Sequence, residues 1–192
     1  MSTLGEERIL EGETPQQYID EHYARYNFAM NFVKKGDIVG DFSCGTGYGT
    51  AKLATKAKKV IGADISGEAI DYCKEQHSAD NIEYRVMNFD ESELPKTDIV
   101  TSFETIEHVD NPLGFIKKIK ETSKALVFSV PMRCPSRFHK TVFENLGEVK
   151  ALFDQAEMPV TLYSQKAYEG DCHIGDPDET KYYCVGVWQK QA

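Results

Sequence analysis

Apolar residues recur along this chain with two alternating periods, one typical of helices and one typical of buried strands. The capping-box pattern Thr14-Pro15-Gln16-Gln17 predicts a helix start, and an apolar stripe at three- and four-residue spacing follows it. The stripe consists of Ile19, Tyr23, Tyr26, Met30 and Val33. A cationic turn and Gly36 then predict the helix end. We expect residues 1–35 to form an N-terminal helical arm or lid.

Beyond the arm, short apolar runs alternate with amphipathic segments. The runs predict strands at Ile38–Phe42, Val60–Ala63, Ile82–Val86, Asp98–Phe103, Ala125–Val130, Pro159–Ser164 and Tyr182–Trp188. The intervening segments predict helices at Gly49–Lys56, Glu68–His77, Pro112–Thr122 and Val142–Gln155. Strands joined by single helices pair in parallel through right-handed crossovers, but no helical pattern separates the last two strands. We therefore expect one α/β domain over residues 1–192, with a doubly wound, Rossmann-like, mostly parallel seven-stranded sheet and an antiparallel edge strand.

Composition narrows the class of protein. The chain has 192 residues, of which 41% are hydrophobic and 28% charged, and its formal net charge is −9. That charge argues against binding a nucleic-acid backbone over a broad surface, which needs clustered Lys and Arg. The five cysteines form no CxxC pair, and no apolar run is long enough to cross a bilayer. Because Met1–Glu11 also lacks the features of a signal peptide, we expect a cytoplasmic protein with reduced thiols.

Glycines mark the turn after the first predicted strand. The sequence DFSCGTGYG, residues 41–49, carries the spacing GxGxG rather than the GxGxxG of dinucleotide folds. Glycine at such a turn lets a ligand approach the backbone closely. Asp64 ends the second strand, and a carboxylate there can accept hydrogen bonds from both hydroxyls of a ribose. The pattern predicts a site for an adenosine-containing cofactor.

This turn, together with VIGADIS at residues 60–66, resembles the class I S-adenosylmethionine-dependent methyltransferases. Residues 88–95, NFDESELP, resemble that family's adenine-binding turn, although Phe89 stands where the family often has glycine. The resemblance implies that S-adenosyl-L-methionine is the cofactor, that Asp90 binds the adenine amino group and that the backbone amide of Glu91 reaches the ring. The implied cofactor-binding residues are Asp41, Ser43, Gly45, Gly47, Asp64, Ile65, Asp90, Glu91 and Phe103.

A cluster of acids and a histidine follows the fourth predicted strand. Glu104, Glu107 and His108 have the spacing ExxEH, which places all three on one face if the turn is helical. Two carboxylates brought together repel each other unless a positive charge lies between them. Oxygen ligands with one nitrogen suit Mg²⁺ or Mn²⁺ better than Zn²⁺. The spacing therefore predicts a divalent metal site.

The same segment resembles two groups of methyltransferases, the O-methyltransferases of ubiquinone biosynthesis and the small-RNA 3′-terminal ribose methyltransferases. In the second group a later histidine completes a Mg²⁺ site, which implies His139 as the fourth ligand here. The sequence as a whole most resembles compact methyltransferases of glycan biosynthesis, through residues 7–13, ERILEGE, and the strand end SFETIEH. Two alternatives stay open: His108 or His139 as a general base without metal, or a purely structural role.

The expected function is O-methylation of a hydroxyl on a sugar or other small metabolite, with assistance from the metal. The resemblance keeps RNA 3′-terminal ribose methylation as an alternative, and Arg133, Arg137 and Lys140 leave room for a short anionic substrate. N-methylation and a non-catalytic cofactor-binding module are further alternatives. We expect a small-molecule partner and neither nucleic acid nor membrane. The remaining histidines, His22, His77 and His173, have no partner at a recognisable spacing and are expected at the surface.

Overall fold

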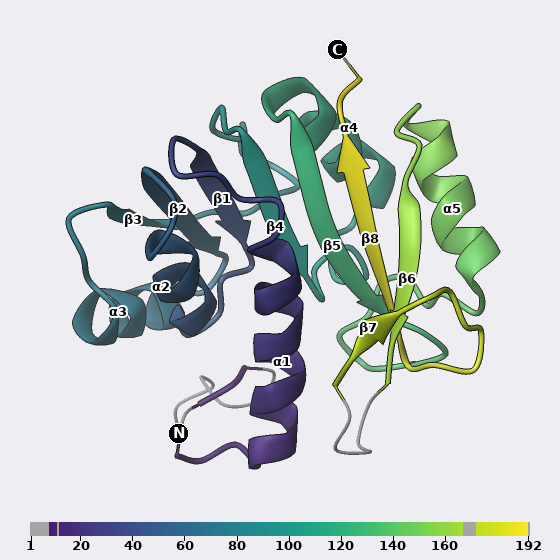
Figure 1. Ribbon diagram of the computed structural model, residues 1–192, viewed down its shortest axis with the longest axis horizontal. Helices are drawn as coiled ribbons and strands as arrows, with labels where there is room; N and C mark the ends of the chain where they lie inside the picture. Colours follow the sequence, from purple (N-terminus) through teal and green to yellow (C-terminus); the bar gives the residue numbers. More distant parts are fainter. Residues whose placement is uncertain (1–7, 11, 167–171, 192) are drawn as a thin grey trace.

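Five of the predicted strands pair in parallel within one sheet. The computed structural model describes residues 8–10, 12–166 and 172–191 (Figure 1). Its strands are β1 (Ile38–Phe42), β2 (Lys59–Asp64), β3 (Ile82–Val86), β4 (Ile99–Phe103), β5 (Ala125–Pro131), β6 (Thr161–Gln165), β7 (Ile174–Gly175) and β8 (Tyr183–Gln189). They form one eight-stranded sheet in the order β3-β2-β1-β4-β5-β8-β6-β7. The strand order reverses between β1 and β4, where doubly wound sheets bind their ligands.

The expectation of a mostly parallel α/β sheet is confirmed, but the predicted number of seven strands is wrong. The additional strand, β7, spans only Ile174–Gly175 and pairs with the end of β6. Two residues are too few for a period to be visible in the sequence. Antiparallel pairing of the last two predicted strands is confirmed, since β8 pairs antiparallel with β5 and β6, but the edge itself is formed by the unpredicted β7. Residues 167–171, in the acidic stretch before β7, lie outside the described residues.

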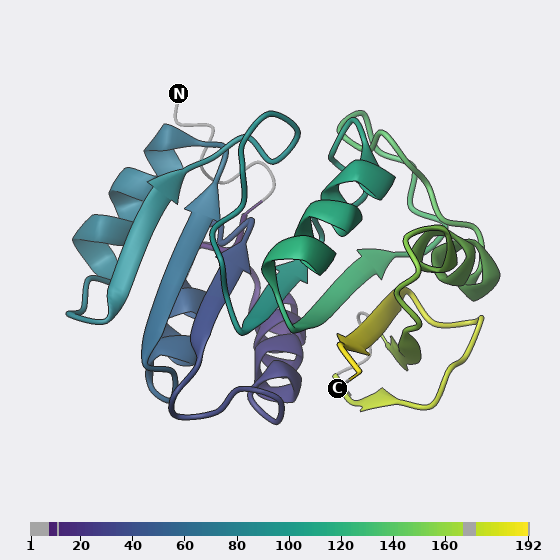
Figure 2. The ribbon, with the colours of Figure 1, turned by 90° about the horizontal axis from the view of Figure 1, so that it is seen from above.

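Helices cover both faces of the sheet (Figure 2). They are α1 (Gln16–Ala29), α2 (Tyr48–Ala54), α3 (Gly67–Gln76), α4 (Pro112–Thr122) and α5 (Leu146–Gln155). The bounds predicted for α4 are confirmed, and the Asn111 side chain caps it by accepting from the Gly114 N–H at 2.9 Å. No helix in the described part of the chain is long and apolar enough to cross a membrane.

Two predicted helix starts, those of α1 and α5, are wrong, and side-chain hydrogen bonds explain both. The Thr14 hydroxyl accepts from the Leu10 N–H at 2.9 Å, so it closes a turn of the arm, and α1 has no side-chain cap. Helix α1 also ends at Ala29, earlier than its apolar stripe suggested. Helix α5 begins at Leu146 because the Asn145 side chain accepts from the Glu148 N–H at 3.0 Å.

Each face of the sheet has its own hydrophobic core. Under α4 and α5 the core contains aromatic rings, and the Phe128 and Phe153 rings stack with centroids 4.3 Å apart. Under α1 and α2 the core contains Tyr26, Val39 and Leu53. Burial on both faces explains why the central strands read as continuous apolar runs.

Helix α1 approaches α2 closely at a glycine. A Cβ atom added to Gly49 would lie 1.9 Å from Cζ of Tyr26. The Tyr26 ring also makes edge contacts with Tyr48 and Phe103, at centroid distances of 5.6 and 4.9 Å. The absence of a side chain at Gly49 therefore allows α1 to lie against the turn that follows β1.

We predict that Gly49→Ala destabilises the protein by about 2 kcal/mol, because the new methyl group overlaps the Tyr26 ring and overpacking typically costs 1–3 kcal/mol. Urea unfolding of the variant measures this loss. Gly67→Ala is the matched control in a helix, since a Cβ atom there meets nothing within 4 Å. Equal stabilities of the two variants would contradict the tight contact between α1 and α2.

Candidate active site

A cleft of about 870 Å³ lies at the carboxyl ends of β1, β2 and β4. This volume falls within the usual range of small-molecule sites. Its walls come from the arm, α1, the turn after β1, and the loops that follow β4 and β5. A smaller cavity of about 400 Å³, near Thr97 and Ser123, contains none of the predicted site residues.

Most of the predicted site residues line the cleft. They are Ser43, Gly45, Asp64, Ile65, Phe103, Glu104, His108 and His139. Five others are not part of its wall: Asp41, Gly47, Asp90, Glu91 and Glu107. The local contacts described below explain why Asp41, Gly47, Asp90 and Glu91 do not line the cleft.

The turn after β1 is open toward the cleft at Gly45. Ser43 and Gly45 both have positive φ, 62° and 56°. A Cβ atom on Gly45 would meet only Cγ of Arg8, at 3.8 Å, so the backbone here is accessible to a ligand. Gly47 instead begins α2, and a Cβ atom there would lie 2.8 Å from Sγ of Cys73. Gly47 therefore allows α3 to approach. Gly45 forms an open stretch of backbone that faces the cleft, here called the cradle.

Asp64 is held at the cleft by backbone hydrogen bonds. Its Oδ2 accepts from the Gly45 N–H at 3.0 Å, and its Oδ1 accepts from the Ser66 N–H at 2.9 Å. The Arg8 guanidinium donates to the same Oδ1 at 3.0 Å. Arg8 belongs to the ERILEGE segment, but its pairing with Asp64 was not predicted, because this ion pair joins the arm to the distant end of β2.

Asp41 lies beneath the turn, fully buried. It accepts from the hydroxyls of Thr50 at 2.6 Å, Thr101 at 2.7 Å and Tyr26 at 3.2 Å. Burial raises the pKa of Asp41 to about 6, and the three hydroxyls only partly offset that effect. In this position Asp41 supports the turn from below and does not reach the cleft.

The turn that resembles an adenine site braces the start of α4. The two oxygens of Asp90 accept from the backbone N–H groups of Asp110 and Asn111, each at 3.0 Å. The backbone N–H of Glu91 donates to the Asn88 carbonyl at 3.3 Å. Both groups expected to contact adenine are thus used within the protein, and neither residue is among those that line the cleft.

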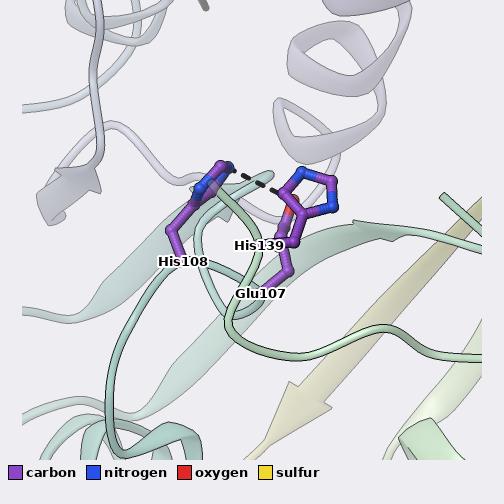
Figure 3. A group of neighbouring side chains, drawn as sticks. All are labelled: Glu107, His108 and His139. Carbon is purple, nitrogen blue, oxygen red and sulfur yellow. Dashed lines mark ion pairs between the residues drawn. The ribbon is translucent and has the colours of Figure 1, made fainter. Parts of the chain in front are cut away.

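Glu107, His108 and His139 converge from the loops after β4 and β5 (Figure 3), and one potential ligand atom from each lies within 4.8 Å of the others. Nδ1 of His108 lies 3.2 Å from the Phe138 carbonyl, and Nδ1 of His139 lies 2.6 Å from the Cys134 carbonyl. Because a carbonyl only accepts, each Nδ1 carries the proton, and each Nε2 keeps its lone pair.

The surroundings of His108 favour the neutral imidazole. Burial, followed by the neighbouring His139, lowers the pKa of His108 below its usual value. Nε2 of His108 lies 3.9 Å from Oε1 of the buried Glu107. Two imidazoles with each Nδ1 directed at a backbone carbonyl, beside a carboxylate, are suited to bind a divalent cation or to accept a proton.

Glu104 does not join this cluster. Its Oε1 is bound by the guanidinium of Arg25 and lies 3.3 Å from Nε2 of His22. Burial alone would raise the pKa of Glu104, but the combined effect of Arg25, His22, His108 and His139 outweighs burial and lowers it. The structure therefore brings three of the four predicted metal ligands together, while the fourth pairs with residues of α1.

Helix α1 supplies functional residues that sequence reasoning missed. His22, expected at the surface, lines the cleft, with its Nδ1 2.7 Å from the Tyr48 hydroxyl. Arg25 is fully buried, but it lies off the apolar stripe of the helix, so the periodicity did not indicate its burial. The cations expected near the site are engaged elsewhere: Arg133 donates to the carbonyls of Glu144 and Lys181, and Lys140 pairs with Asp110.

The cleft lies at the strand-order reversal of a Rossmann-like α/β sheet, where folds of this class bind their ligands. A protein-family model described as a methyltransferase domain matches residues 40–125. A mitochondrial ubiquinone biosynthesis O-methyltransferase of Schizosaccharomyces pombe is 33% identical over 95 residues, which cover 46% of this chain and 35% of that protein. A Mycobacterium tuberculosis protein named as a probable S-adenosylmethionine-dependent methyltransferase is 25% identical over 138 residues, covering 69% of this chain and 49% of that protein.

Solved structures agree on the fold. A methyltransferase of Haloferax volcanii, solved in complex with the Trm112 activator, superimposes with a TM-score of 0.75 at 17% identity, over 92% of both chains. Residues 40–125 are thus similar to a methyltransferase domain, and the chain shares the fold of that solved structure. It spans between about a third and a half of the length of the two curated relatives.

We predict that Asp41 makes stability decrease with rising pH. A raised carboxyl pKa means that the folded state binds more protons than the unfolded state between pH 3.8 and about 6, so the contribution is present at low pH and is lost as pH rises through about 6. Urea unfolding of the wild type and Asp41→Asn should therefore differ by a free energy that falls by about 2 kcal/mol between pH 4 and pH 7. Asp80→Asn, at an exposed position, controls for the loss of an acid; a constant difference for Asp41→Asn would contradict the burial effect.

Proposed function

We propose that this protein is an S-adenosylmethionine-dependent O-methyltransferase that acts on a hydroxyl of a sugar or other small metabolite, with assistance from a divalent cation. One observation carries the proposal: Glu107, His108 and His139 each bring one potential ligand atom within 4.8 Å of the others, and both imidazole side chains line the same cleft as the glycine turn and Asp64. The O-methyltransferase named above, which this chain resembles at low identity, supports oxygen as the acceptor atom.

The described residues fit the cofactor. Gly45 offers an open backbone cradle, Asp64 presents a carboxylate oriented by two N–H groups, and Ile65 exposes 63% of its surface beside them. These three would hold the adenosyl part. When bound, S-adenosylmethionine supplies a methyl group on a sulfonium sulfur, so the carbon–sulfur bond breaks as the carbon–oxygen bond forms. Phe103 and Tyr183 line the same cleft and help to exclude water from it.

The chain's own contribution is to receive a proton and to hold the acceptor. A hydroxyl is a weak nucleophile at neutral pH, and it becomes a stronger one as its proton leaves. Nε2 of His139 or His108 is positioned to take that proton, because each Nδ1–H is anchored on a backbone carbonyl. This base role is open to the two histidines with or without a cation.

The donor set also fits a divalent cation, but not the one expected first. Two imidazoles and one carboxylate favour Mn²⁺ and other transition metals over Mg²⁺, which prefers oxygen ligands. Glu104, the second carboxylate of the predicted set, is engaged by Arg25. A cation held by Glu107, His108 and His139 would supply positive charge that lowers the pKa of an acceptor hydroxyl. We further propose a reducing, cytoplasmic setting, which the five free cysteines support.

RNA methylation is the weaker alternative. The net charge of −9 and the engagement of Arg133 and Lys140 away from the cleft leave no basic wall for a nucleic-acid strand among the described residues. The acceptor that these charges favour is small and uncharged.

We predict that His139→Ala lowers kcat/KM for methyl transfer by about 10²- to 10⁴-fold, the range expected for loss of a general base. The measurement is transfer of labelled methyl groups from S-adenosylmethionine to a panel of sugars, phenols and short RNA. Binding of S-adenosylhomocysteine, followed by calorimetry, should stay within about twofold of the wild type, because the variant leaves the glycine turn intact.

His77→Ala is the matched control, since His77 ends α3, away from the cleft, and should leave activity unchanged. Full activity of His139→Ala would contradict the role of the histidine pair. Failure of the wild type to bind S-adenosylhomocysteine would remove the methyltransferase proposal itself.

A further inference from the structure

Glu104 was predicted to bind the metal together with Glu107, but its side chain contacts Arg25 and His22 instead. It follows β4 directly and has a positive φ of 50°, uncommon for a residue with a side chain. All its described side-chain contacts use Oε1, which binds Arg25 and His22. The side chain keeps 27% of its surface exposed and lines the cleft. Its Oε2 is therefore available to a ligand.

The partners of Glu104 are fixed from behind. Arg25 lies outside the cleft wall, fully buried, with its Nη1 2.8 Å from Oε1 of Gln165 and its guanidinium 4.4 Å from the centroid of the Tyr183 ring. Arginine in such a setting orients a carboxylate and keeps its charge. The cation thus faces the protein interior, while the carboxylate faces the cleft.

His22 adds a second constraint. A carboxylate only accepts, so Nε2 of His22 carries the proton and donates toward Glu104, while Nδ1 accepts from the Tyr48 hydroxyl. Burial and the charge of Arg25 lower the pKa of His22 to about 4, so the ring is neutral at physiological pH. Tyr48 thus orients the His22 ring by a hydrogen bond, and the neutral ring lies beside Glu104.

The charge balance indicates what Glu104 would bind. Arg25 and Glu104 together carry no net charge, so Oε2 offers a strong hydrogen-bond acceptor without a net negative site for a cation. Aromatic rings from Tyr18, Tyr48 and Tyr183 line the same cleft and provide flat apolar surface. A neutral ring that carries several hydroxyls matches both features.

We propose that Glu104 is an acceptor-binding residue rather than a metal ligand, that its Oε2 receives a hydrogen bond from a second hydroxyl of a neutral, sugar-like acceptor, and that Arg25 and His22 are positioning residues for it. This inference rests on the proposed function. It goes further by dividing the ExxEH segment into two roles: Glu107 and His108 belong to the cation or base, and Glu104 selects the substrate.

The first part of the test uses Mn²⁺ alone, titrated by calorimetry into the wild type, Glu104→Gln and Glu107→Gln. Glu104→Gln should bind Mn²⁺ within about twofold of the wild type, whereas Glu107→Gln should bind it at least about tenfold more weakly. Glu75→Gln, at an exposed position on α3, is the control for loss of a negative charge. A tenfold loss of Mn²⁺ affinity in Glu104→Gln would overturn the inference by making Glu104 a ligand.

The second part uses methyl α-D-glucopyranoside and its monodeoxy analogues as acceptors. Removing the hydroxyl that Glu104 binds should lower kcat/KM of the wild type about tenfold or more, as expected for a hydrogen bond to a charged group. The same removal should not affect Glu104→Gln, whose own loss should lie mainly in KM. Equal losses in both proteins for every analogue would overturn the inference.

His22 variants separate positioning from folding. His22→Ala should raise KM for the glucoside, and His22→Gln, which keeps an N–H donor, should restore part of the loss. If the wild type transfers no methyl group to the glucoside, the acceptor class named here is wrong. S-adenosylhomocysteine binding in the same samples then decides whether the methyltransferase assignment itself survives.

Discussion

A buried carboxylate beneath the turn after β1 connects the elements that form the cleft. Asp41 accepts hydrogen bonds from Tyr26 of α1, Thr50 of α2 and Thr101 of β4, so one side chain fixes a helix of the arm, the helix after the glycine turn and the neighbouring parallel strand. The cost of burying this acid appears in its pKa, raised to about 6. A group that burial disfavours is retained here because three donors converge on it and orient the cradle above.

An ion pair between α1 and the end of β4 also shapes the cleft. Arg25 of α1 is fully buried, and burying it requires an anion at short range, which Glu104 supplies. The pair therefore ties the arm to the end of β4, and it also changes the chemistry of the ExxEH segment. With Glu104 oriented by α1, the remaining donors are one carboxylate and two imidazoles, a set with different metal preferences from the one the spacing suggested.

Backbone carbonyls determine which ring nitrogen of His108 and His139 carries the proton. The loop after β5 contributes His139 and the two carbonyls, of Cys134 and Phe138, that fix both ring tautomers. The same loop is attached to the end of β4 where the backbone N–H groups of Lys140 and Thr141 donate to the Glu107 carbonyl. Proton acceptance and cation binding both need a free Nε2 lone pair, and this loop provides it on two rings at once.

The sequence by itself determined the alternation of strands and helices, the glycine turn, Asp64 at the end of β2 and the convergence of Glu107, His108 and His139 on one edge of the sheet. These follow from local periods and from the rule that carboxyl ends of parallel strands meet. It did not determine the two-residue strand β7, the roles of Asp41 and Asp90 inside the protein, or the positions of Arg8, His22 and Arg25. Those depend on contacts between residues far apart in the chain, because a side chain with several possible partners is assigned to one only when the packed helices and strands bring that partner within hydrogen-bond distance.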